Sequence, residues 1–175
     1  MARRRRIGEG KVPTEEPITT TERKIQFIST GCVVFDCVLG GGWPLGRMSN
    51  LVGDKSTGKT LCAIEAAANF ARRYPDGYIF YREAEAAFDE DYAASLGLPI
   101  DRVDFGEEGL GTPWDTIEDI YEDLNAKCEQ CIKEKVPGLY IIDSLDALSS
   151  RAELSRGIDE GSYGMEKQKQ LGQLF

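Results

Sequence analysis

Residues 53–60 have types and a spacing that can bind the phosphates of a nucleotide. They fit the phosphate-loop (Walker A) pattern G-x-x-x-x-G-K-S/T at every fixed position. The glycines let backbone N–H groups approach phosphate oxygens without a Cβ in the way. The lysine ammonium can reach the β- and γ-phosphates, and the final hydroxyl can ligate a magnesium ion. The expected nucleotide-binding residues are Gly53, Asp54, Lys55, Ser56, Thr57, Gly58, Lys59 and Thr60, with Thr60 also the metal ligand.

The sequence around this stretch predicts the order strand, loop, helix, which aims a helix N-terminus at an anion. Residues 48–52 predict a short buried strand, and residues 61–74 predict a helix. The apolar face expected on that helix consists of Ala63, Ala66, Ala67, Phe70 and Ala71. A glycine-rich turn that matches by chance is the alternative, and the flanking elements argue against it. We therefore expect the chain to bind ATP with Mg²⁺.

Acidic residues follow two other predicted strands. Asp143 comes directly after the apolar residues 139–142, a position typical of a carboxylate that holds magnesium directly or through water. A helix cap after the strand is the alternative for this residue. Glu85 follows the strand predicted at residues 78–81 and is the candidate for orienting the attacking water. Glu83 is its rival, and the residue pattern alone does not choose between the two.

The composition indicates one globular domain without histidine chemistry. The chain has 175 residues, enough for a single domain with a core. The absence of histidine excludes Ser-His-Asp and Cys-His nucleophile systems and histidine metal sites. No apolar run approaches the length of a membrane span, and the N-terminus lacks the apolar block of a secretory signal. We therefore expect no membrane partner and a cytoplasmic location.

The charge is distributed unevenly along the chain, whose net charge is −9. Residues 1–24 include consecutive arginines at positions 3–6 and predict a flexible basic and polar arm. Such an arm can hold nucleic-acid phosphates, or it can simply be solvated. The remainder of the chain is acidic, which argues against nucleic acid covering a whole face. Any such contact is expected to be local, or shared among several subunits.

The cysteines do not indicate a metal or redox site. Cys128 and Cys131 form a C-x-x-C pair, but no second pair and no histidine completes a zinc site. Both are predicted on the apolar side of a helix, which also carries Ile117, Ile120, Tyr121, Leu124 and Ile132. We expect them to be small buried residues.

The remaining pattern alternates strands with helices after residue 25. The first predicted elements are a helix at 33–39 ended by glycines 40–42, a turn at 74–77 and a strand at 78–81. A short helix capped by Asp89 follows and ends near Gly97, and a weak strand is predicted at 103–105. The last two are a helix that starts at Thr112, Pro113, Trp114 and Asp115 and runs to about Lys135, and a strand at 139–142. Nearly all-apolar strands between helices predict an α/β fold, a three-layer doubly wound parallel sheet. Thr60, Glu85 and Asp143 should then converge at the carboxyl edge of the sheet. The helical pattern that resumes at residue 165 has no terminating signal, so the domain at 25–175 is expected to end within a helix.

Several motifs together resemble the RecA recombinase family, and its phage-type members most. They are Ile-Ser-Thr-Gly at 28–31, Leu-Gly-Gly-Gly at 39–42, Pro-Leu-Gly-Arg at 44–47, the phosphate loop, Ala-Glu-Ala-Ala-Phe-Asp at 84–89, Tyr-Ala at 92–93 with Leu-Gly at 96–97, and Ile-Ile-Asp-Ser-Leu-Asp-Ala-Leu at 141–148. The resemblance covers residues 24–175 and implies a P-loop NTPase core of RecA-like type. It also implies that the chain stops before the second DNA-binding loop, the sensor residue and the last core strands.

The resemblance assigns roles to particular residues. It implies that Glu85 is the catalytic glutamate, acting with Lys59, and that Asp143 lies near magnesium. It places Asp89 and Tyr92 beside the adenine. Residues 152–164 match the first DNA-binding loop, where the candidates for contacting single-stranded DNA, there and just beyond, are Arg156, Tyr163 and Lys167. Asp54 and Lys55 depart from the proline and acid that are commoner in this family.

The function that the resemblance implies is a DNA-dependent ATPase of homologous recombination and DNA repair. Such a protein forms filaments on single-stranded DNA and promotes strand exchange. The first alternative is a ring-forming RecA-like ATPase of the helicase or clock type. The second is a nucleotide-binding fragment of a split gene with no independent activity, for which a C-terminal piece could be the complement. In either case we expect this chain alone to be a weak or inactive ATPase. If the gene belongs to a phage, the compartment is the cytoplasm of the bacterial host.

Overall fold

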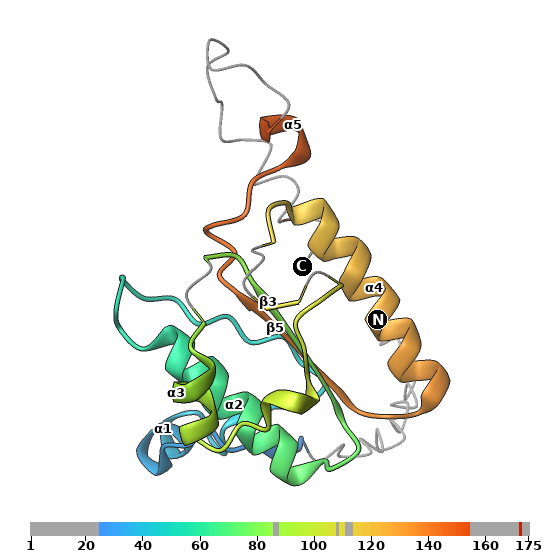
Figure 1. Ribbon diagram of the computed structural model, residues 1–175. Helices are drawn as coiled ribbons and strands as arrows, with labels where there is room; N and C mark the ends of the chain where they lie inside the picture. Colours follow the sequence, from blue (N-terminus) through green and yellow to red (C-terminus); the bar gives the residue numbers. More distant parts are fainter. Residues whose placement is uncertain (1–24, 86–87, 108, 111–113, 155–171, 173–175) are drawn as a thin grey trace, which may run out of the picture.

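The computed structural model describes residues 25–85, 88–107, 109–110, 114–154 and 172 (Figure 1). The arm predicted for residues 1–24 lies outside this part of the chain. The elements are β1 (Phe27–Ile28), α1 (Val33–Val38), β2 (Trp43–Pro44), α2 (Lys59–Arg73), β3 (Tyr78–Glu83), α3 (Glu90–Ser95), a 3₁₀ turn (Ile100–Arg102), β4 (Val103–Asp104), α4 (Ile117–Glu134), β5 (Gly138–Asp143) and α5 (Arg151–Leu154). None of the helices in these ranges combines the length and the apolar composition that a membrane crossing requires.

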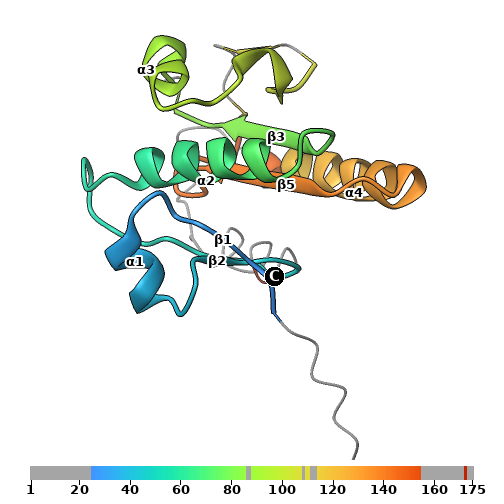
Figure 2. The ribbon, with the colours of Figure 1, turned by 90° about the horizontal axis from the view of Figure 1, so that it is seen from below.

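A parallel sheet with the strand order β4-β3-β5 positions the rest of the fold. β3 and β5 pair along their whole length, from Tyr78 opposite Gly138 to Glu83 opposite Asp143. β1 and β2 form a separate antiparallel pair that contacts α2 (Figure 2). The prediction of an α/β fold with a parallel sheet is confirmed.

The two faces of the sheet carry different apolar clusters, because successive side chains of a strand point to opposite faces. On one face, Ile79, Leu139 and Ile141 pack with residues of α2, including the fully buried Ala67 and Ala68. On the other face, the partly buried side chains of Tyr140 and Ile142 pack with α4 and with the segment after β5, through the buried Ile117, Ile120 and Leu148. Helices therefore flank the sheet on both faces.

Three predicted elements form close to their expected positions. The helix predicted at 61–74 is α2, and the strands predicted at 78–81 and 139–142 are β3 and β5, each slightly longer than predicted. Asp89 caps α3 as expected, since its Oδ1 accepts a hydrogen bond of 2.9 Å from the backbone N–H of Tyr92. Apolar periodicity and local cap chemistry suffice for these elements.

Residues 48–52 do not form the buried strand that their apolar run predicts. Met48 and Val52 are 60% and 84% exposed, and no backbone hydrogen bond joins this segment to another described residue. A strand requires a partner for its N–H and C=O groups, and an apolar run alone does not supply one. The valines of α1 are exposed as well, so the N-terminal part of the chain presents apolar side chains to solvent.

The helix predicted to start at Thr112 starts four residues later. Thr112 and Pro113 lie outside the described residues, but Trp114 and Asp115 precede α4, and Thr116 is the N-cap. The hydroxyl of Thr116 accepts a hydrogen bond of 3.1 Å from the N–H of Asp119, which caps the helix, and donates one to the carboxylate of the same residue. Tertiary contacts select this cap, because the N–H of Trp114 donates to the β3 carbonyl of Glu83 at 2.8 Å and keeps the chain extended there.

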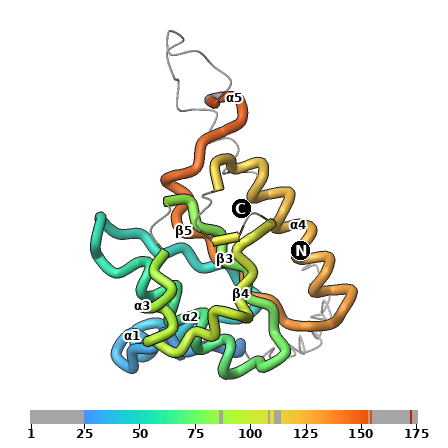
Figure 3. Tube along the Cα trace, viewed as in Figure 1, coloured from blue at the N-terminus to red at the C-terminus, as the bar shows by residue number. Residues whose placement is uncertain are grey.

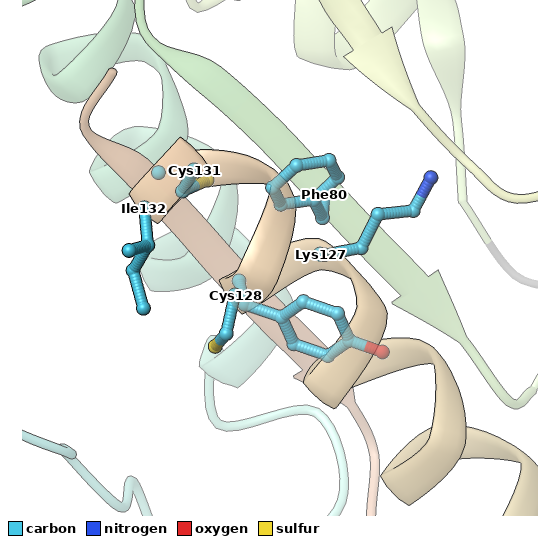
Figure 4. A pocket seen from close by; sticks show the side chains of 7 residues that line it. Phe80, Lys127, Cys128, Cys131 and Ile132 are labelled. Carbon is cyan, nitrogen blue, oxygen red and sulfur yellow. The ribbon is translucent and has the colours of Figure 1, made fainter. Parts of the chain in front are cut away.

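The prediction that both cysteines of α4 are buried is wrong for Cys128. This residue is exposed and Cys131 is half-buried, and all five cysteines of the chain, each within the described residues, are free. Both line an open pocket between α4 and the sheet, together with Phe80, Lys127, Ile132, Gly138 and Tyr140 (Figure 4). The buried residues of α4 are Ile117 and Ile120, both in its N-terminal part, which leaves its C-terminal cysteines near solvent.

A buried arginine, which sequence analysis did not single out, joins β3 to β4 and α4. Arg82 is 0% exposed, and its Nε donates to Asp123 Oδ2 at 2.6 Å. Its Nη1 donates to the carbonyl of Asp104 at 2.5 Å and to the carboxylate of the same residue at 3.2 Å. The guanidinium carbon also lies 5.1 Å from the ring centre of Trp114 and 5.4 Å from that of Tyr140. Burial alone would lower the pKa of Arg82, but Asp123 and Asp104 outweigh it and raise the pKa, so the group stays charged.

Arg82→Met should destabilise the fold, because it leaves the partly buried carboxylate of Asp123 without its cation, whereas Asp104 keeps its ion pair with Lys127 at 2.8 Å. We expect the free energy of unfolding to fall by about 3 kcal/mol, the lower end of the cost of breaking a buried ion pair. Urea denaturation measures this change. Arg72→Met is the matched control: Arg72 is an exposed residue of α2 that hydrogen-bonds Asn69, and its replacement should cost no more than about 0.5 kcal/mol. Equal midpoints for the two variants would contradict the role of Arg82.

Asp119 should make stability depend on pH in the acid range. Its hydrogen bonds from Thr116 and from Arg151 hold the pKa of the carboxyl below its ordinary value. Since the folded pKa is the lower one, the stabilisation is complete above the unfolded value of about 4 and is lost as pH falls through the folded pKa. Asp119→Asn should therefore lose less stability than the wild type when urea midpoints are compared at about pH 5 and about pH 3. Parallel losses in the two proteins would argue against this contribution.

Candidate nucleotide-binding site

The loop at residues 53–60 leads directly into α2, whose first residue is Lys59. Gly58 is the N-cap and has φ +91°, a left-handed conformation that favours glycine. A Cβ at Gly53 would lie 2.7 Å from Oγ1 of Thr57, so a side chain here would displace the Thr57 hydroxyl from its place in the loop. The fixed glycines of the pattern thus have separate physical reasons in the folded loop.

Lys59 turns back over the loop. Its Nζ donates hydrogen bonds of 2.9 Å each to the carbonyls of Gly53 and Asp54. The Thr57 hydroxyl donates to the same Asp54 carbonyl at 2.8 Å. The ammonium is therefore held beside the N-terminus of α2, where the first N–H groups have no acceptor within the helix. A cation and free N–H groups at one helix N-terminus form an arrangement suited to phosphate.

The carboxyl ends of β3 and β5 bring Glu85 and Asp143 to one edge of the sheet. The strands are in register at Glu83 and Asp143, and the N–H of Ala84 donates to the Asp143 carbonyl at 2.9 Å. Beyond the strands, the Ser144 hydroxyl donates to Glu85 Oε1 at 2.8 Å. Ser144 was not among the predicted site residues, although it directly follows Asp143 in the sequence.

Thr60 is not joined to this pair. It is exposed on the first turn of α2 and hydrogen-bonds neither Glu85 nor Asp143. Within the described ranges, no group of three or more Cys, Asp or Glu side chains gathers as a metal site. Magnesium commonly needs only one or two protein carboxylates and completes its shell with water and substrate phosphates. Asp143 fits this requirement, because the only hydrogen bond of its carboxylate within the described part of the chain is the one that Oδ2 accepts from Tyr81.

Glu83 and Glu85 have different environments. Glu83 is 7% exposed, and its Oε1 accepts a hydrogen bond of 2.5 Å from the N–H of Phe88. This bond ties the segment after β3 back to the strand. Glu85 is exposed at the end of β3 and has its carboxylate at the strand edge beside Ser144. Glu83 therefore has a structural contact, whereas Glu85 is open to solvent.

Tyr81 supports Asp143 from within the sheet. Its hydroxyl donates a hydrogen bond of 2.9 Å to Asp143 Oδ2, and the residue is 0% exposed. Burial, and next the nearby charge of Asp143, raise the pKa of Tyr81 far above its ordinary value, so the phenol keeps its proton. From the sequence, Tyr81 is predicted only as part of an apolar strand. The signal that could have identified it is that a buried tyrosine hydroxyl usually requires a hydrogen-bond partner.

The other predicted site residues are placed only in part. Asp89 and Tyr92 lie together at the start of α3, and α3 packs with α2 through the buried Ala93 (Figure 3). Tyr92 is 46% exposed, and the role of both residues toward adenine stays a prediction. Arg156, Tyr163 and Lys167, the predicted DNA-binding residues, lie outside the described residues.

Comparison with known proteins identifies relatives of this chain. The family described as RecA N-terminal domain matches residues 5–172. Proteins named Protein RecA are similar in Nostoc punctiforme (33% identity, 83% of this chain and 37% of that protein), Prochlorococcus marinus strain MIT 9211 (36%, 81% and 34%) and Streptococcus gordonii (34%, 83% and 35%). The chain thus spans about a third of the length of these relatives, and the closer likeness to phage members stays a prediction. From the family match and these identities, we conclude that the chain belongs to the RecA recombinase family, a family of DNA recombination and repair, and corresponds to its N-terminal part.

Proposed function

We propose that residues 53–60 bind ATP and that the chain is the ATP-binding part of a P-loop core with a three-layer doubly wound sheet. One observation carries the proposal: Nζ of Lys59 lies within 2.9 Å of two loop carbonyls, beside the N-terminus of a 15-residue helix. Bound phosphate would replace these carbonyls as acceptor, and hydrogen bonds between charged partners are about twice as strong as those between neutral groups.

Mg²⁺ is the proposed cofactor, held by Thr60 and Asp143. It would supply charge neutralisation on the β- and γ-phosphates. Asp143 has a carboxylate oxygen without a hydrogen bond to any described residue, and the Thr60 hydroxyl is exposed at the end of the loop. Asp89 and Tyr92 are proposed to contact the adenine from the start of α3.

Glu85 is the proposed residue that orients the attacking water, with Lys59 as its catalytic partner. It is favoured over Glu83 because its carboxylate is exposed at the strand edge that carries Asp143. The Ser144 hydroxyl fixes one of its oxygens, which leaves the other available to accept a hydrogen bond from water. The carboxylate of Glu83 is already engaged with the backbone of Phe88.

For the whole protein, we propose a DNA-dependent ATPase of homologous recombination that forms filaments on single-stranded DNA and promotes strand exchange. The membership in the RecA family supports this proposal. Arg156, Tyr163 and Lys167 are the proposed DNA contacts. A cytoplasmic location and self-association, with a complementing C-terminal piece if the gene is split, complete the proposal.

Lys59→Ala tests the nucleotide site. Removing the ammonium should weaken binding of a fluorescent ATP analogue with Mg²⁺ by about tenfold or more, as expected for lost hydrogen bonds to a charged partner. A fluorescence titration measures this. Lys133→Ala, the same change at an exposed position of α4, is the control and should bind like the wild type. Equal affinity of Lys59→Ala and the control would remove the phosphate loop from the proposal.

Glu85→Gln and Glu83→Gln test which carboxylate orients the water. In an active, full-length version of the protein, Glu85→Gln should keep ATP binding and lose turnover by about a hundredfold or more. Glu83→Gln should affect turnover less, because its oxygen can still accept the hydrogen bond from Phe88. Phosphate release measures turnover in both variants. A larger loss from Glu83→Gln would reverse the assignment.

A further inference from the structure

We propose that Tyr81 is a positioning residue for Asp143, which fixes one carboxylate oxygen and leaves the other for the metal. The inference rests on the proposed role of Asp143 toward Mg²⁺. The observed contact is the 2.9 Å hydrogen bond from the Tyr81 hydroxyl to Asp143 Oδ2. It joins the side chains of neighbouring strands, in which Tyr81 is paired with Ile141, two residues before Asp143.

The phenol ring of Tyr81 is buried and lies against two other aromatic rings. Tyr81 lies in β3, the central strand, and is 0% exposed. Its ring makes an edge contact with Phe88 at 4.9 Å between centres and a tilted contact with Phe105 at 6.1 Å. These neighbours limit rotation of the ring, so the hydroxyl presents a fixed donor to the end of β5.

The consequence for Asp143 is a fixed carboxylate. Its backbone is held by the pairing with Glu83 and by the N–H of Ala84, and its side chain by Tyr81. A donor on Oδ2 sets the rotation of the carboxylate before a metal arrives. Ligating carboxylates are commonly oriented by such hydrogen bonds, and loss of one typically costs 10–100-fold in metal affinity or activity.

The same strand provides a matched comparison. Tyr78 also belongs to β3, and its hydroxyl donates to a carboxylate as well, that of Glu134 near the end of α4. This contact lies at the opposite end of β3 from Asp143 and Glu85. Tyr78→Phe therefore removes the same chemical group from the same strand without touching the proposed metal site.

The experiment measures how the binding of a fluorescent ATP analogue depends on Mg²⁺. Tyr81→Phe keeps the ring and removes only the hydroxyl. We expect the half-saturating Mg²⁺ concentration to rise about tenfold. Nucleotide affinity in excess EDTA should match that of the wild type, because no metal takes part there. Tyr78→Phe should match the wild type in both conditions.

Asp143→Asn and the double variant separate failure of this inference from failure of the proposed function. If Tyr81 acts through Asp143, adding Tyr81→Phe to Asp143→Asn should cause no further change in Mg²⁺ dependence. If Asp143→Asn changes the Mg²⁺ dependence and Tyr81→Phe does not, the positioning role is overturned and the metal site stands. If Asp143→Asn itself has no effect, or no nucleotide binds at any Mg²⁺ concentration, the proposed metal site fails and the inference fails with it. An equal loss of affinity by Tyr81→Phe in EDTA would show a merely structural role.

Discussion

The buried guanidinium of Arg82 is the interaction on which the arrangement of this fold depends. It enters the core from β3 and is neutralised by Asp123 of α4 and Asp104 of β4, so one cation fixes two elements relative to the central strand. The aromatic rings of Trp114 and Tyr140 lie beside it. Desolvating a charge is costly, and this cost is offset only while all of these groups keep their geometry. Their mutual position is therefore specified more tightly than by apolar packing alone.

The pairing of β3 with β5 connects the elements fixed by Arg82 to the candidate site. The strands stay in register up to Glu83 and Asp143, which fixes where the chain leaves the sheet on both sides. Successive side chains of β3 point to opposite faces of the sheet. Arg82 therefore points to the α4 side, whereas Tyr81 donates a hydrogen bond to Asp143. Glu83 secures the segment that carries Glu85 through the N–H of Phe88. The site is thus built from short-range consequences of one strand register.

Much of the fold follows from periodicity, and the exceptions are positions where distant contacts decide. The predictions for α2, β3 and β5 hold because their apolar patterns are long and consistent. The start of α4 was misplaced because Thr112 and Thr116 are each followed three residues later by an acidic residue, and only distant contacts favour the second. These contacts are the hydrogen bond of Trp114 to β3 and that from the N–H of Ser149 to the carbonyl of Asp115 at 2.8 Å. Residues 48–52 have the composition of a strand but no partner within the described chain. Arg82 was not predicted because no local sequence pattern indicates that an arginine near the end of a strand is buried.

The sequence predicted which residue types form the candidate site, but it did not predict the hydrogen bonds between them. The phosphate-loop pattern and the acidic residues after apolar strands were visible in the sequence. The hydrogen bonds of these acidic residues to Tyr81 and Ser144 were not.

The hydrogen bonds of Lys59 to its own loop have a consequence for ligand selectivity. A bound anion would have to replace the two carbonyl groups that accept hydrogen bonds from the Lys59 ammonium. A neutral or weakly charged group forms weaker hydrogen bonds with an ammonium and gains too little free energy from this exchange. In the proposed nucleotide site, the loop would therefore favour ligands with a high density of negative charge, before any contact with a base or sugar is made.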